Sequence, residues 1–132
     1  MFVYRNDNPR GNFTAEDCVV RAISIVTGEP WGKVYTDLCV EGFAAGDCGH
    51  SNGSWDTYLR RRGFKRYICP NDCPFCYSVS NFADDHKTGS FIVATGAHAV
   101  AVVDGNYIDA WDSGNEIPIY YYTKEEVTDG GT

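Results

Sequence analysis

Apolar residues in the first half of the chain recur at the spacing of helices. From Val19 to Val26 they fall three and four positions apart, which places them on one buried face of a helix. The pattern Thr14-Ala-Glu-Asp17 matches a capping box at the start of this helix, and Gly28 ends it. Similar patterns predict further helices at 31–43, 54–62 and 78–86, with a glycine-rich loop over 44–53.

The second half of the chain has the composition and alternation of strands. Beyond Gly89, four strands are predicted at 91–95, 98–103, 107–111 and 117–122, with Asp104-Gly105 as a hairpin turn. Shorter extended segments are expected at 2–4 and 64–69. Helices followed by a meandering antiparallel sheet indicate an α+β fold. We expect one domain over residues 1–123 and a polar, flexible tail over 124–132.

Composition and charge argue against nucleic acids and membranes as partners of this protein. The 132 residues are 43% hydrophobic, which suits one packed core, and the formal net charge of -7 gives no general attraction to phosphate backbones. No stretch approaches the ~18 apolar residues of a membrane span, and the N-terminus lacks an apolar secretory signal. We therefore expect a cytoplasmic protein with no nucleic-acid or membrane partner.

The first chemical candidate is Cys18. Six cysteines in a chain without an export signal favour catalysis, metal binding or burial over a disulfide framework. Cys18 falls in the first turn of the predicted helix, where unpaired N–H groups and the helix dipole stabilise a thiolate, the reactive form of cysteine. The alternative is a small buried cysteine on the core side of the helix.

His98 is the candidate base for Cys18. It begins the hairpin HAVAVVDGNYIDAWDSG, whose apolar run fixes the strand in the core while the imidazole emerges at the sheet end. A catalytic histidine also needs a group that accepts its other ring proton. With a two-residue turn, His98 faces Trp111 and Asp109 lies diagonally on the same face. With a three-residue turn, Asp112 is the direct cross-strand partner, and we favour Asp112 over Asp109.

This order of residues resembles the papain-like cysteine peptidase superfamily. There too, a cysteine lies near a helix start, a histidine heads a strand, and Asn or Asp closes the return strand. The segments DCVVRAIS and HAVAVVDGNYIDAWDSG are also similar to small peptidase C39-like or papain-like proteins of bacteria and phages. The resemblance implies N-terminal helices carrying the cysteine, packed on a C-terminal antiparallel sheet carrying histidine and aspartate, in a bacterial or phage-infected cell.

The resemblance also implies a reaction. Where papain has an oxyanion-binding glutamine, six residues before its cysteine, this chain has Asn12, and Asn8 is a second candidate. The Cys18 thiolate would attack a peptide or isopeptide carbonyl of a peptide or protein substrate, and His98 would protonate the leaving amine. Release by water makes a hydrolase, and release by an amine makes a transamidase. Papain's propeptide and cleft domain have no counterpart here, which narrows the prediction to a cysteine hydrolase or transferase.

A second cysteine pattern suggests zinc. Cys69, Cys73 and Cys76 are spaced C-x3-C-x2-C, and Cys48 or His50 would complete a tetrahedral site. Such a zinc would be structural, because the thiol mechanism requires no cofactor. The alternative is free or buried thiols.

Two other functions stay open from the sequence. The chain would be a zinc-stapled binding module if Cys18 and His98 were catalytically silent. It would be a phage accessory protein if it modified a component of the host.

Overall fold

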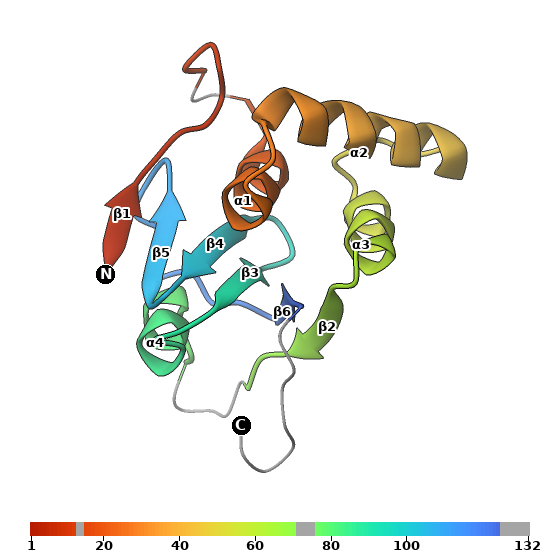
Figure 1. The fold of residues 1–132 in the computed structure, drawn as a ribbon. Coiled ribbons are helices and arrows are strands. Elements are labelled where there is room, and N and C mark those ends of the chain that lie inside the picture. The colour runs from red at the N-terminus through yellow and green to blue at the C-terminus, as the bar shows by residue number, and fades with distance from the viewer. Residues whose placement is uncertain (13–14, 71–75, 125–132) are drawn as a thin grey trace.

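The computed structural model describes residues 1–12, 15–70 and 76–124. Within these ranges, four helices enclose a six-stranded mixed sheet (Figure 1). The helices are α1 (Cys18–Thr27), α2 (Trp31–Ala45), α3 (Asn52–Arg61) and α4 (Val79–Asp85). The α+β class is therefore confirmed. None of these helices has the length and apolar character needed to cross a membrane.

The strand order is β1-β5-β4-β3-β6-β2. In that order the strands are Phe2–Tyr4, Asn106–Asp109, Ala99–Val103, Ser90–Ala94, Tyr120–Thr123 and Lys65–Ile68. The meander prediction holds for β3, β4 and β5 and is wrong elsewhere, because β6 pairs with β3 and β1 runs parallel to β5. These pairings join segments far apart in the sequence, which local patterns do not specify.

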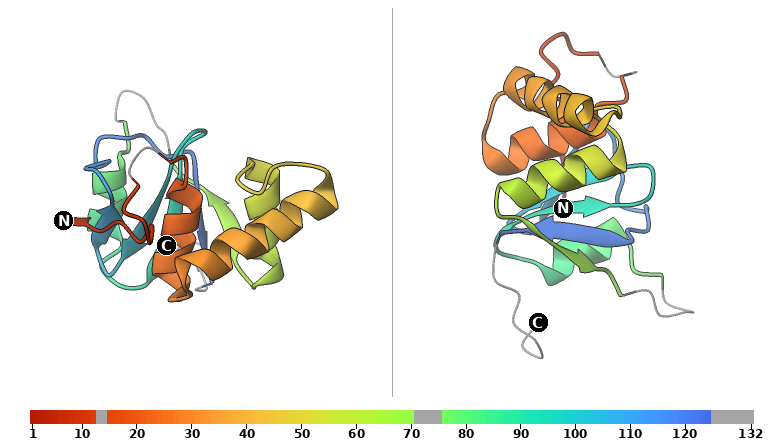
Figure 2. Two further views of the ribbon diagram at one scale, coloured as in Figure 1. Left: turned by 90° about the horizontal axis from the view of Figure 1, so that it is seen from above. Right: turned by 90° about the vertical axis from the view of Figure 1, so that its right-hand side faces the viewer.

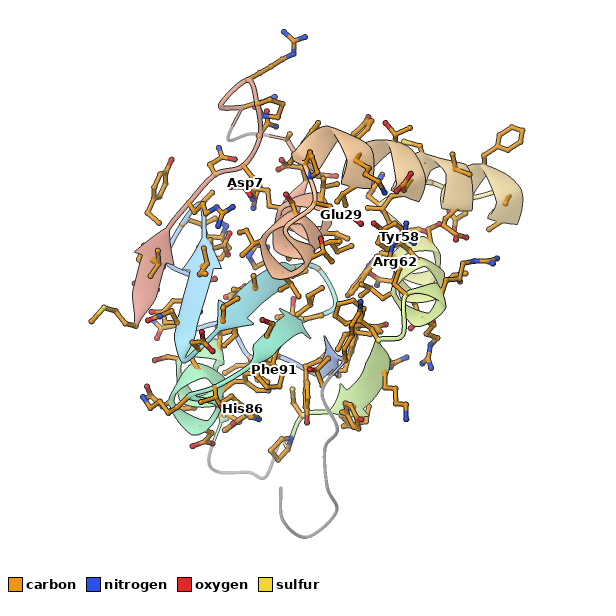
Figure 3. The ribbon with its side chains drawn as sticks, in the orientation of Figure 1. Asp7, Glu29, Tyr58, Arg62, His86 and Phe91 are labelled. Carbon is orange, nitrogen blue, oxygen red and sulfur yellow. The ribbon has the colours of Figure 1, made fainter. Side chains whose placement is uncertain are left out.

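The sheet has a hydrophobic core on each face. α1 and α3 pack on one face with α2 above them, and α4 covers the other, as the two views in Figure 2 show. Alternate residues of β3 point to opposite sides, so Ile92 joins the first core and Val93 the second. His86 stacks on Phe82 and lies beside Phe91 (Figure 3), which makes it a packing residue of the second core.

Helix α1 begins later than the capping-box pattern predicts. Asp17 is the N-cap, Cys18 is the first helical residue, and the Asp17 side chain makes no capping hydrogen bond. Gly28 ends the helix as predicted, in the left-handed conformation at φ 76°. The cysteine thus lies directly at the positive end of the helix dipole.

The β4–β5 turn fixes the register on which the site depends. Val103 pairs with Asn106, so Asp104 and Gly105 alone form the turn. Both have positive φ, 50° and 84°, as a type I′ turn requires. Of the two registers considered, the structure therefore has the one that places Asp109 near His98.

Candidate active site

Cys18 and His98 meet where α1 packs on β4. His98 directly precedes β4, and its backbone is fixed by hydrogen bonds with Thr95, at 2.9 Å from His98 N to Thr95 Oγ1 and 2.8 Å from Thr95 N to His98 O. The half-buried Cys18 thiol lies close enough to the His98 side chain and to the backbone of Ala99 for both to lower its pKa. Two of the sequence-predicted residues are thus brought together.

The imidazole of His98 is held from two further directions. Its Nε2 lies 2.7 Å from Asp109 Oδ2, which leaves Nδ1 for the contact with Cys18. The Trp111 ring packs against it with centroids 4.8 Å apart. The His98 side chain is only 11% exposed, so these contacts define its orientation.

The Asp109 carboxylate accepts four hydrogen bonds from described residues. Oδ2 accepts from His98 Nε2 and from Ser113 Oγ, each at 2.7 Å. Oδ1 accepts from Ala110 N at 2.7 Å and from Arg21 Nη2 at 3.3 Å. Burial by itself raises the pKa of Asp109, but the bonds from His98 and Ser113 outweigh it, and the net pKa is lowered. Asp109 is therefore a buried carboxylate held in its charged form.

The pKa values of Cys18 and His98 move towards an ion pair. Burial opposes both charges, but the hydrogen bond from His98, the backbone of Ala99 and the charge of Arg21 lower the pKa of Cys18. Burial likewise lowers the pKa of His98, whereas the bonds to Asp109 and Cys18 raise it, to about 9 overall. Both shifts favour a thiolate beside an imidazolium.

Asp112 is not the partner of His98. Its Oδ1 accepts hydrogen bonds from the Tyr107 hydroxyl at 2.8 Å and from Gly114 N at 3.0 Å. The preference for Asp112 over Asp109 is therefore wrong. It required a three-residue turn, and the observed two-residue turn makes Asp109 the neighbour instead.

The two asparagines predicted to bind an oxyanion lie elsewhere. Asn8 is buried, and its Nδ2 donates to Asp17 Oδ2 at 3.2 Å. Asn12 is exposed. Among the described residues, both line a second cavity of about 490 Å³, and neither lines the cavity at Cys18. The sequence prediction for Asn8 and Asn12 is thus not supported by their positions.

Cys18 and His98 open onto a cavity of about 590 Å³. Its walls come from α1, the start of α3, and the loops around Gly96 and Trp111. Ala15, Glu16 and His50 line this cavity and also the one beside Asn8, so the two cavities adjoin.

Sequence reasoning missed the ion pairs that surround Asp109. Arg21 is buried on α1 and lies between Asp17 and Asp109, and Ser113 supports Asp109 from the loop after β5. One signal was available: Arg21 is a charged residue within the apolar run CVVRAISIV, where a buried charge requires a partner.

The predicted zinc ligands are dispersed where the structure describes them. Cys69 is buried in the second core, where burial raises its pKa to about 12, whereas Cys48 and Cys76 are exposed. Cys73 lies outside the described residues. Among the residues that are described, no three His, Cys, Asp or Glu side chains gather as a metal site. The zinc site stays a prediction.

Searches for relatives among protein-family models, curated proteins and solved structures find no match.

Proposed function

We propose that this protein is a cysteine hydrolase with a papain-like mechanism, acting on a peptide or isopeptide bond. Cys18 is the nucleophile, His98 the general acid and base, and Asp109 the group that orients His98. One observation carries the proposal: a thiol at a helix N-terminus lies beside an imidazole that lowers its pKa, and Nε2 of that imidazole lies 2.7 Å from a buried carboxylate. This is the arrangement that nucleophilic thiol catalysis needs.

The proposed reaction begins with attack by the thiolate. Cys18 Sγ bonds to the carbonyl carbon, and the oxyanion that forms lies near the unpaired backbone N–H groups of the first turn of α1. His98 gives its Nδ1 proton to the leaving nitrogen, the C–N bond breaks, and a thioester remains on Cys18. Neutral His98 then takes a proton from water, the resulting hydroxide attacks the thioester, and the acid product leaves as the thiolate returns.

Asp109 keeps its negative charge throughout this cycle. Its lowered pKa and its hydrogen bonds stabilise the imidazolium form of His98 and hold the ring with Nδ1 towards Cys18. An amine in place of water would complete the same cycle as transamidation, because the thioester is common to both outcomes.

Thiol reactivity tests the proposal. We expect iodoacetamide at pH 6 to alkylate Cys18 faster than the exposed Cys39, Cys48 and Cys76, which serve as internal controls, since alkylation follows the thiolate fraction. Peptide mass spectrometry after timed quenching gives the rate at each cysteine. The His98→Ala variant should lower the rate at Cys18 alone. Equal rates at Cys18 and the three exposed thiols would rule out the proposed function.

A further inference from the structure

A buried ion network continues from the proposed catalytic residues into α1. The side chains of Asp17, Arg21 and Asp109 are 5%, 7% and 3% exposed, respectively. Arg21 Nη1 donates to Asp17 Oδ1, and Arg21 Nη2 lies 3.3 Å from Asp109 Oδ1. One guanidinium thus bridges the residue before Cys18 and the carboxylate that contacts His98.

Asp17 is fixed independently of Arg21. Its Oδ2 accepts from Asn8 Nδ2 at 3.2 Å and from Trp31 Nε1 at 3.1 Å, so the N-terminal segment and α2 both hold it. Its Oδ1 is left for Arg21. Arg21 therefore has one anchored carboxylate on its own helix and one carboxylate across the interface between α1 and β5.

Stability alone does not account for this network. Buried ion pairs lose much of their Coulomb energy to desolvation, and apolar residues of similar volume often serve stability as well or better. Arg21 Nε is also buried with no hydrogen-bond partner among the described residues, which is a further cost. A group kept at such a cost next to a reactive thiol is a candidate for a functional role.

We propose that Arg21, anchored by Asp17, is a positioning residue that holds Asp109 Oδ2 towards His98 and fixes α1 relative to β5. This inference rests on the proposed function, because it assigns Arg21 a part in the same reaction. Arg21 occupies Oδ1, so only Oδ2 is directed at His98 Nε2. Arg21 also lies one turn after Cys18 on α1, so the bridge that orients Asp109 holds the helix that carries the thiol.

The variant Arg21→Lys tests this role. Lysine keeps the positive charge but cannot bridge two carboxylates with a planar fork. We expect the pH profile of Cys18 alkylation to move to higher pH, with a rate at pH 6 lower by about three- to tenfold, corresponding to a pKa rise of about half to one unit. The ring resonances of His98, followed by NMR across the same pH range, should titrate at lower pH than in the wild-type protein.

Arg62→Lys is the matched control. Arg62 is a partly buried arginine that pairs with Asp37 and stacks 3.6 Å from the Tyr58 ring centroid (Figure 3). Arg62 is the C-cap of α3 and lines a separate cavity with Val26 and Thr27, at the opposite end of α1 from Cys18. This change should lower the thermal unfolding midpoint without moving the alkylation profile. The comparison separates positioning from a general loss of stability.

Two outcomes would overturn the inference. One is an alkylation profile of Arg21→Lys that coincides with the wild-type profile. If Cys18 is still the fastest-reacting thiol of the wild-type protein, this result rejects the role of Arg21 and leaves the proposed function intact. If Arg21→Lys does not fold, Asp17→Asn removes the anchor and should shift the profile in the same direction, and an unshifted profile there overturns the inference too. Failure of wild-type Cys18 to outreact the exposed cysteines instead rejects the proposed function itself.

Discussion

At the scale of single residues, the site depends on which aspartate meets His98. Both Asp109 and Asp112 accept hydrogen bonds, but only Asp109 is buried and bonded to the imidazole. A carboxylate there stabilises the imidazolium by its charge, whereas an amide would not. The two residues therefore form a natural pair of test and control positions.

We expect Asp109→Asn to slow Cys18 alkylation at pH 6 by about tenfold or more, because His98 loses the charge that favours its protonated form. Asp112→Asn should leave that rate within about twofold and lower the free energy of unfolding by about 1 kcal/mol or less, because the amide oxygen can still accept the bonds from Tyr107 and Gly114. Alkylation kinetics and urea unfolding on both variants provide the measurements. A larger kinetic effect of Asp112→Asn would contradict the assignment.

The sequence predicted the contact between Cys18 and His98, but it did not predict the charged residues around them. Cys18 and His98 were identifiable because local sequence patterns predict where helices start and where strands end. Asp109 required the length of a turn: Asp104-Gly105 favours a two-residue loop, but the sequence is also compatible with a three-residue loop that includes Asn106. Arg21 was missed because most helical arginines are solvated, and its burial depends on contacts with β5, which only the fold brings close.

At the scale of elements, a close approach between α2 and the loop after it places His50 beside both cavities. A Cβ on Gly42 would lie 2.6 Å from Gly49 N and 2.7 Å from Asp47 O. A Cβ on Gly49 would lie 2.9 Å from the Leu38 backbone. The loop can therefore pack on the helix only because both positions lack a side chain.

The glycines of α2 give a direct test of this packing. Gly42→Ala should lower the free energy of unfolding by about 1–3 kcal/mol, because the added methyl group meets backbone that cannot move freely. Gly32→Ala on the same helix has open space around it, and should be neutral or stabilising by up to about 1 kcal/mol. Chemical unfolding of both variants measures the contrast, and equal stabilities would show that the loop is not packed as described.

The positions of the helices and strands were easier to predict than the pairing of the strands. Glycine content correctly indicated a loop after α2, and Ser78 correctly marked the start of α4, where it accepts from Asn81 N in a capping box. The predicted start of α3 at residue 54 was wrong, because the helix begins at Asn52 with Ser51 as its N-cap. No local sequence pattern predicts the parallel pairing of β1 with β5, since it joins residues more than a hundred positions apart.

At the scale of the whole molecule, the site joins the two halves of the chain. α1 brings the thiol, and the sheet brings the imidazole and the carboxylate, so the ion pairs of the site are also contacts between layers. Folding is therefore coupled to the protonation of these groups. That coupling gives a prediction for stability against pH.

The two charges of the Cys18 and His98 pair depend on pH in opposite ways. The pKa of His98 is raised from 6.5 to about 9, so its stabilising contribution is fully present below pH 6.5 and is lost as the pH rises through about 9. The pKa of Cys18 is lowered from 9.0, so the contribution of its thiolate is present above pH 9.0 and is lost as the pH falls through the folded-state pKa.

Between these limits the contributions compensate. Between the lowered folded-state pKa of Cys18 and pH 9, the folded pair holds one proton, on His98, and above pH 6.5 the unfolded pair also holds one, on Cys18. Equal proton binding in the two states gives no slope of stability with pH from this pair. This equality of proton binding requires both Cys18 and His98.

Cys18→Ala removes the compensation. Asp109 still raises the pKa of His98 in this variant, so the folded state keeps a proton that the unfolded state has released. We expect its free energy of unfolding to fall relative to the wild-type protein by about 1–2 kcal/mol between pH 6.5 and 9. Urea unfolding at several pH values gives both curves, and other titrating groups cancel in the comparison. Adding His98→Gln to Cys18→Ala should remove the difference in slope, and parallel curves for Cys18→Ala and wild type would show that His98 is not held protonated by Asp109.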